Sequence, residues 1–139
     1  MNNKLKIGDK GQFQKTITET DIVLFAGISG DFNPVHVSET EAEKTIFGER
    51  IAHGMLGASL ISTVIGMYMP GPGTIYLEQN CKFKKPVKIG DTLTAAVEIV
   101  EIVNREKGIL KLGNTITNQE DEVVITGESV VKVDSEKLL

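Results

Sequence analysis

A carboxylate and an imidazole lie five residues apart in this chain, at Asp31 and His36. Histidine titrates near neutral pH, and a nearby carboxylate can orient it or take a proton itself, so the pair is suited to acid–base chemistry. Pro34 fixes its own φ and biases Asn33 toward extended conformations, while Gly30 permits backbone conformations that a side chain would forbid. The same residue types are common in ordinary turns. The pattern therefore predicts either a rigid proton-handling loop or a plain turn.

Length, charge and cysteine content limit the class of protein. The 139 residues predict a single domain, residues 1–139, that can bury a sizeable core. A net charge of −4 gives no reason to expect nucleic acid or an anionic membrane as a partner. The one cysteine, Cys81, cannot form a disulfide within the chain, and the first residues show no apolar signal-peptide core. These features predict a cytoplasmic protein.

The first half of the chain is expected to be mainly helical. Residues 11–17 have the pattern of a short strand. Thr18 or Thr20 can cap a helix that runs to about Ala26, and a capping-box pattern predicts another helix over residues 39–47. These two helices would flank the Asp31 loop and position it.

A long apolar segment, residues 51–69, ends at a Pro-Gly-Pro-Gly run. Its length allows a membrane span to be considered. The segment also contains His53, serines and glycines, and a helix that is apolar all round is typical of a fully buried core helix. We therefore expect a central helix that packs tightly against a sheet.

The second half of the chain is rich in β-branched residues separated by short polar breaks. Four strands are predicted, over residues 74–83, 92–103, 108–117 and 122–133. Short connections between long strands predict an antiparallel meander. One buried helix and one curved antiparallel sheet give an α+β domain in which the sheet wraps the helix.

Further segments extend the pattern around Asp31 and His36. The run 25–36, with its Asp-x-Asn-Pro-x-His core, is followed by His-Gly-Met within 51–55 and by residues 82–87 and 90–93. Together they resemble the MaoC-like (R)-specific enoyl-CoA hydratases, also called type 2 hydratases. The resemblance covers most of the chain and implies a hot-dog fold and a homodimer, or a higher oligomer, whose sheets join edge to edge. It also implies reversible addition of water to a trans-2-enoyl-CoA, which gives an (R)-3-hydroxyacyl-CoA.

The resemblance implies three catalytic residues. Asp31 and His36 would grip one water, and which of them is the base and which the acid is left open. Gly54 matches the family's oxyanion donor, and it also opens the predicted central helix, where free N–H groups and the positive helix end converge. Asn33 would bind substrate and orient the loop, or serve as a packed turn residue. His53 either joins the catalytic residues or is a packed or a capping residue at the helix start.

The implied substrate is an acyl thioester of CoA or of an acyl carrier protein. The acyl chain is expected beside the central helix, with Ser62 and Ile65 as substrate-binding residues. Four lysines would attract the CoA phosphates or else protect a solvated strand edge: Lys82, Lys84, Lys85 and Lys88. Because CoA is part of the substrate, no separate cofactor and no metal are expected.

Two other functions stay open. A hot-dog acyl-CoA thioesterase commonly centres on a carboxylate on the helix, and residues 51–69 contain no Asp or Glu. A non-catalytic acyl-thioester-binding subunit would not need both Asp31 and His36. The sequence therefore favours a hydro-lyase, either a hydratase or a 3-hydroxyacyl-thioester dehydratase.

Overall fold

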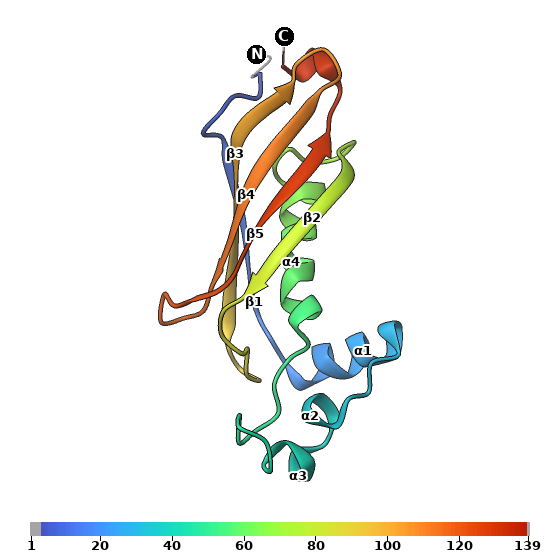
Figure 1. Cartoon of the computed structure of the whole chain (residues 1–139), viewed down its shortest axis with the longest axis vertical. Helices are drawn as coiled ribbons and strands as arrows, with labels where there is room; N and C mark the ends of the chain where they lie inside the picture. The colour runs from blue at the N-terminus through green and yellow to red at the C-terminus, as the bar shows by residue number, and fades with distance from the viewer. Residues whose placement is uncertain (1–3, 139) are drawn as a thin grey trace.

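A computed structural model describes residues 4–138 of the chain (Figure 1). Its centre is a five-stranded antiparallel sheet beside one long helix, α4 (Gly54–Met67). The strands are β1 (Lys10–Thr16), β2 (Ile75–Phe83), β3 (Thr92–Asn104), β4 (Ile109–Thr117) and β5 (Val123–Lys132). The remaining elements are α1 (Glu19–Ser29), α2 (Pro34–Val37), α3 (Glu39–Ala42) and a 3₁₀ turn (Ser135–Lys137). This arrangement confirms the predicted α+β class.

The strand order across the sheet is β1-β3-β4-β5-β2. Hairpins join β3 to β4 and β4 to β5, as predicted. The predicted four-strand meander is wrong at β2, because β2 pairs with β5 at the far edge and not with β3. The segment after β2 does not form a hairpin with β3. Instead, the Val87 carbonyl accepts from the Ala52 amide at 2.7 Å and Lys88 bridges to Ile51, which carries the chain across to β3.

The core lies between α4 and one face of the sheet. Strand residues alternate between this face and solvent, as the period of two in a β-strand requires. The buried aliphatic side chains include Leu93, Val97 and Ile99 of β3, Leu110, Leu112 and Ile116 of β4, and Leu60, Ile61 and Val64 of α4. Burial of each contributes about 1.5–3 kcal/mol. The packed core gives α4 a fixed position on the sheet.

One face of α4 is exposed. Met55, Ser59, Ser62 and Gly66 recur at helical spacing along this face, whereas Ile61 and Val64 are fully buried. The expectation of a fully buried helix is therefore wrong for one stripe, because the sheet covers α4 from one side. Within residues 4–138, no helix is both long and apolar enough to cross a membrane.

Helix α1 begins with the predicted cap at Thr18. The Thr18 hydroxyl accepts from the Asp21 amide at 3.1 Å, and the Asp21 carboxylate accepts from the Thr18 amide at 2.9 Å. Burial raises the pKa of Asp21, but these hydrogen bonds and Lys15 outweigh burial and hold the pKa below its usual value. The helix continues past the expected end at Ala26, to Ser29. Gly30 ends it with a φ of 80°, in the left-handed region that glycine adopts readily.

Helix α3 is much shorter than the predicted helix over residues 39–47. Ser38 caps it as expected, but the helix ends at Ala42. The Thr45 hydroxyl donates to the Ala42 carbonyl at 2.7 Å and so competes for an acceptor that a longer helix would use. Figure 1 shows α1, α2 and α3 grouped beyond one end of the sheet, next to the first turn of α4.

Candidate active site

The Asp31 loop is built from successive bonds between side chains and the backbone. The Ser29 hydroxyl accepts from the Asp31 amide at 3.2 Å, and the Asp31 carboxylate accepts from the Asn33 amide at 3.1 Å. The Asn33 side chain then accepts from the Val35 amide at 3.2 Å and caps α2. These bonds fix the loop, as the sequence predicted. Asn33 has a local structural role here, and its contact with substrate stays a prediction.

His36 lies on the short helix α2, and not in the loop or turn that the sequence predicted. Asn33 does take an extended-like conformation, but Pro34 occupies the first helical position, where its missing N–H costs nothing. His36 is 8% exposed, and its Nδ1 lies 2.8 Å from the Ile51 carbonyl. Because a carbonyl only accepts, Nδ1 carries the proton in the neutral ring. Nε2 is therefore the nitrogen with a free lone pair.

Arg50 anchors the segment that carries His36. Its Nε donates to the His36 carbonyl at 2.8 Å, and a terminal guanidinium nitrogen donates to the Glu19 carboxylate at 2.7 Å. The side chain of Arg50 is only 10% exposed. Arg50 therefore joins α1 to α2 through charge-assisted hydrogen bonds.

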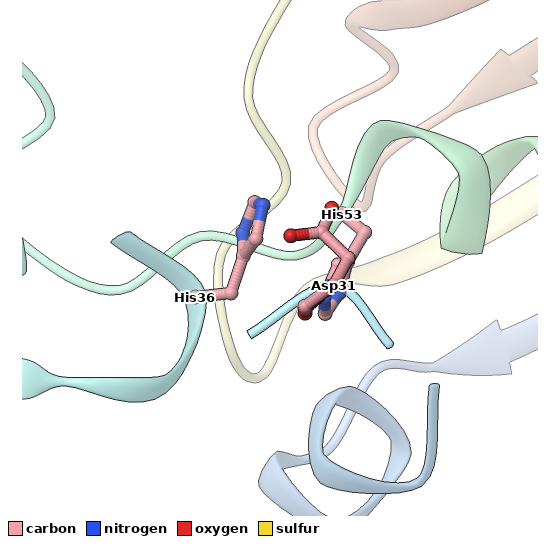
Figure 2. A group of neighbouring side chains, drawn as sticks. All are labelled: Asp31, His36 and His53. Carbon is pink, nitrogen blue, oxygen red and sulfur yellow. Dashed lines mark hydrogen bonds between the residues drawn. The ribbon is translucent and has the colours of Figure 1, made fainter. Parts of the chain in front are cut away.

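His53 lies in contact with both predicted proton-handling residues. Its ring stacks on that of His36, with centroids 4.0 Å apart and planes 28° apart. Its Nε2 lies 2.9 Å from the Asp31 backbone carbonyl. Figure 2 shows the three side chains gathered together, with the Asp31 carboxylate directed toward the His36 ring, and one ligand atom from each lies within 4.8 Å of the others. The structure thus places His53 inside the cluster, where the sequence left its role open.

Two cavities adjoin this cluster. One, of about 340 Å³, is lined by His36, and the other, of about 460 Å³, is lined by Asp31. Both are also lined by His53, Gly54 and Phe83. The predicted pair therefore faces adjoining hollows that meet at the start of α4.

Gly54 lies at the first position of α4, where the backbone N–H has no partner within its own helix. A Cβ at this position would come within 2.9 Å of the Phe83 ring. The absence of a side chain therefore lets Phe83 approach and leaves the backbone beside both cavities. Close packing and access to the N–H group both account for a glycine here.

The two predicted acyl-chain residues lie away from these cavities. Ser62 is exposed on the open stripe of α4, and Ile65 is 2% exposed in the core. Among the described lining residues, neither cavity includes them. Their role in substrate binding stays a prediction.

Two of the four lysines, Lys84 and Lys85, line the His36 cavity. Lys85 pairs with Glu122, and Lys88 pairs with Glu49 at 3.3 Å. The hydrogen bonds from Lys85 and Asn118 lower the pKa of Glu122. The lysines are exposed, so each can serve either of the two predicted roles.

The three clustered side chains offer the ligand types of a metal site, but their geometry is poor for one. The two imidazoles stack on one another with their centroids 4.0 Å apart. One nitrogen of each ring already lies at a carbonyl oxygen. The arrangement suits proton transfer better than metal coordination.

Comparisons with known proteins agree with this fold. The MaoC-like domain family matches residues 3–122. The (R)-specific enoyl-CoA hydratase of Rhodospirillum rubrum is 49% identical over 93% of this chain and 88% of its own length. The 3-hydroxybutyryl-CoA dehydratase of Methylorubrum extorquens is 45% identical over 93% of this chain and 81% of its own length.

Solved structures of (R)-hydratases have the same fold. That of A. caviae superposes with a TM-score of 0.89 at 41% identity, covering 94% of this chain and 98% of the other. The unliganded R-hydratase of Pseudomonas aeruginosa superposes with a TM-score of 0.88 at 41% identity, covering 95% of this chain and 86% of the other. The chain belongs to the MaoC-like family, and both the resemblance and the hot-dog fold are confirmed.

Sequence reasoning did not predict the contacts of His53, Arg50 and Phe83. His53 and Asp31 are 22 residues apart in sequence, so no local pattern reports their bond. The only available signal was the position of His53 directly before Gly54. His53 occupies the N-cap of α4 but makes no side-chain cap bond, so the interpretation as a capping residue is wrong.

Proposed function

We propose that this protein is an (R)-specific enoyl-CoA hydratase that adds water reversibly to trans-2-enoyl-CoA. The observation that carries the proposal is the cluster itself. A carboxylate and an imidazole with a free Nε2 meet beside the open first turn of α4. The names of the related hydratases support the substrate class and the configuration at C3.

In the proposed reaction, Asp31 and His36 hold one water near C3 of the substrate. Attack forms the C3–O bond, the C2–C3 π bond opens, and the electron pair moves onto the thioester oxygen. Asp31 and His36 together accept the proton that the water loses and return a proton to C2. As C2 is protonated, the electron pair on the oxygen re-forms the thioester carbonyl, so protons and electrons balance. Because the groups lie within 4.8 Å of one another and act on the same water, we assign no separate acid and base roles to them.

The Gly54 N–H is the proposed donor to the enolate oxygen. It combines a free backbone proton with the positive end of the α4 dipole, where negative charge is stabilised. Loss of one such donor typically lowers turnover by about 10²–10³. The substrate would thus be fixed between the α4 terminus and the water held by the pair, which makes addition to one face of the double bond the expected result.

The remaining features of the proposal concern the context of the site. We propose one domain that acts on an acyl-CoA, or on a carrier-protein thioester, without a separate cofactor or metal. Ser62, Ile65 and Asn33 are kept as proposed substrate contacts. A cytoplasmic location is proposed on the single cysteine, which fits a reducing compartment.

We also propose a homodimer. The edge strand β2 exposes Ile75 and Leu77 near its start, which are 56% and 48% exposed, and its end at Phe83 lies beside the first turn of α4, where Met55 is 60% exposed. An uncovered strand edge with apolar residues is a surface on which a second sheet can pair. The pairing of two β2 edges would cover these side chains.

The test is an assay that separates hydration from hydrolysis. A series of trans-2-enoyl-CoA chain lengths is added, and enoyl absorbance and free thiol are followed together. We expect absorbance to fall while the thioester stays intact, with Asp31→Asn as the inactive control. Rapid thiol release with the double bond retained would establish the thioesterase instead. The absence of any reaction would favour the non-catalytic binding subunit.

Dehydration is a second candidate for the physiological direction. The relative from Methylorubrum extorquens is named as a 3-hydroxybutyryl-CoA dehydratase, which is the reverse of the same reaction. A catalyst accelerates both directions equally, so the same site serves either. Concentrations of enoyl-CoA and hydroxyacyl-CoA in the cell would decide between them.

A further inference from the structure

His53 is one of only two histidines in the chain, and it contacts both residues of the proposed pair. It is 3% exposed and lies at the N-cap of α4 without capping it. Phe25 packs against its other side, with ring centroids 4.9 Å apart. A buried polar ring held in this way needs an account that neither helix capping nor simple burial supplies.

The hydrogen bond of His53 fixes its tautomer. Nε2 lies 2.9 Å from the Asp31 carbonyl, so Nε2 carries the proton and donates it. The other nitrogen, Nδ1, is buried and has no hydrogen-bond partner among residues 4–138. A proton on Nδ1 would place a donor where the described chain offers no acceptor, so the neutral Nε2–H form is the one that fits. His36 has the opposite tautomer, because its Nδ1 donates to the Ile51 carbonyl at 2.8 Å.

We propose that His53 is a positioning residue for the hydration reaction, an inference that rests on the function proposed above. Its Nε2–H holds the backbone of Asp31, and its ring supports one face of His36 (Figure 2). One side chain therefore sets the distance between two groups that lie on different elements, the loop and α2. Misplacement of catalytic groups by about 1 Å can lower turnover by about 10²-fold. Loss of the hydrogen bond from His53 to the Asp31 carbonyl should therefore have a measurable effect on turnover.

Two substitutions separate the hydrogen bond from the ring. His53→Gln can keep an N–H near the former Nε2 position while it removes the ring. His53→Phe keeps a ring against His36 and removes the donor. We expect His53→Phe to lower kcat by about 10²-fold with little change in KM, and His53→Gln to recover most of the loss, to within about tenfold of wild type. Equal losses in both variants would overturn the proposal, since a purely structural role does not distinguish the donor from the ring.

A spectroscopic experiment tests the inference without any assay of activity. Two-bond proton–nitrogen correlation spectra of the wild-type protein show two imidazoles, and His53→Gln assigns them by removing one. We expect a protonated Nε2 for His53 and a protonated Nδ1 for His36. We also expect the Asp31 carbonyl carbon signal to move in His53→Phe and to stay near its wild-type position in His53→Gln. A protonated Nδ1 on His53 in the wild-type protein would overturn the inference. This result does not depend on whether the variants at His53 fold. If these signals behave as expected but no water is added to enoyl-CoA, the proposed function fails and the bond to Asp31 stands.

Discussion

The strongest prediction concerns the shared water of Asp31 and His36. Asp31→Asn removes the charge but keeps an oxygen that can accept from the Asn33 amide. His36→Asn is the matched change, because its side-chain nitrogen can still donate to the Ile51 carbonyl while Nε2 is lost. Both variants therefore preserve the local bonds and remove only the groups that face the water.

Each single variant should lower kcat by about 10²–10⁴-fold, the usual contribution of a positioned acid–base group. This loss is about 2.7–5.4 kcal/mol of transition-state stabilisation at 1.36 kcal/mol for each factor of ten. If the two groups acted independently, their losses of kcat would multiply to about 10⁴–10⁸-fold in the double variant. Because the ligand atoms lie within 4.8 Å and act on one water, the double variant should be little slower than the slower single variant.

The assay is the initial rate at which the enoyl absorbance falls, with circular dichroism and sedimentation as controls for fold and assembly. Losses that multiply would refute the shared water. Turnover close to wild type in either single variant would refute the assignment of that residue.

Three further predictions follow from particular contacts. Gly54→Ala places a Cβ within 2.9 Å of Phe83 and keeps the backbone N–H, so we expect kcat to fall by about 10-fold or more only because the ring and helix start shift, and an unchanged rate would speak against close packing as the reason for a glycine here. Asp21→Ala should lower the free energy of unfolding by about 0.5–1 kcal/mol at pH 7. The pKa of Asp21 is lowered in the folded state, so its stabilisation is present above the unfolded value of 3.8 and is lost as pH falls through the folded pKa. In urea denaturation, the difference between the two proteins should therefore begin to shrink near pH 3.8 and vanish only below the lowered pKa of the folded state, and a constant difference would contradict this cause. Sedimentation of the wild-type protein should give a dimer, and a charged residue at Leu77 should weaken it, whereas a fully active monomer would exclude the proposed interface.

Local features of the fold were predictable because their causes are local. Thr18 and Ser38 cap helices as their side chains allow, and each strand lies within a few residues of its predicted range. The pairing of β2 with β5 was not predictable, because it depends on contacts of residues 84–91 with Ile51 and Ala52. The pattern of a strand predicts which residues are extended, but it does not predict at which edge of the sheet the strand pairs.

The candidate site also combines residues that could be predicted from the sequence with contacts that could not. Asp31, His36 and Gly54 were found from a motif, and the structure brings them to adjoining cavities. The contacts of His53 and Arg50 were not predictable, because each bridges elements that meet only in the folded chain. Ser62 and Ile65 were chosen for their place on the central helix. Which face of α4 meets the sheet is a tertiary property that the apolar segment did not reveal.

The most direct test of the proposed hydration is the fate of the water oxygen. The wild-type protein is incubated with trans-2-butenoyl-CoA in water enriched in oxygen-18, and the product is examined by mass spectrometry and chiral chromatography. We predict that the label enters the hydroxyl at C3, that this carbon has the (R) configuration, and that the thioester carbonyl stays unlabelled. Label in a free carboxylate would show hydrolysis, and label at C3 in the (S) configuration would show that water reaches the opposite face. Either result would contradict the proposed function.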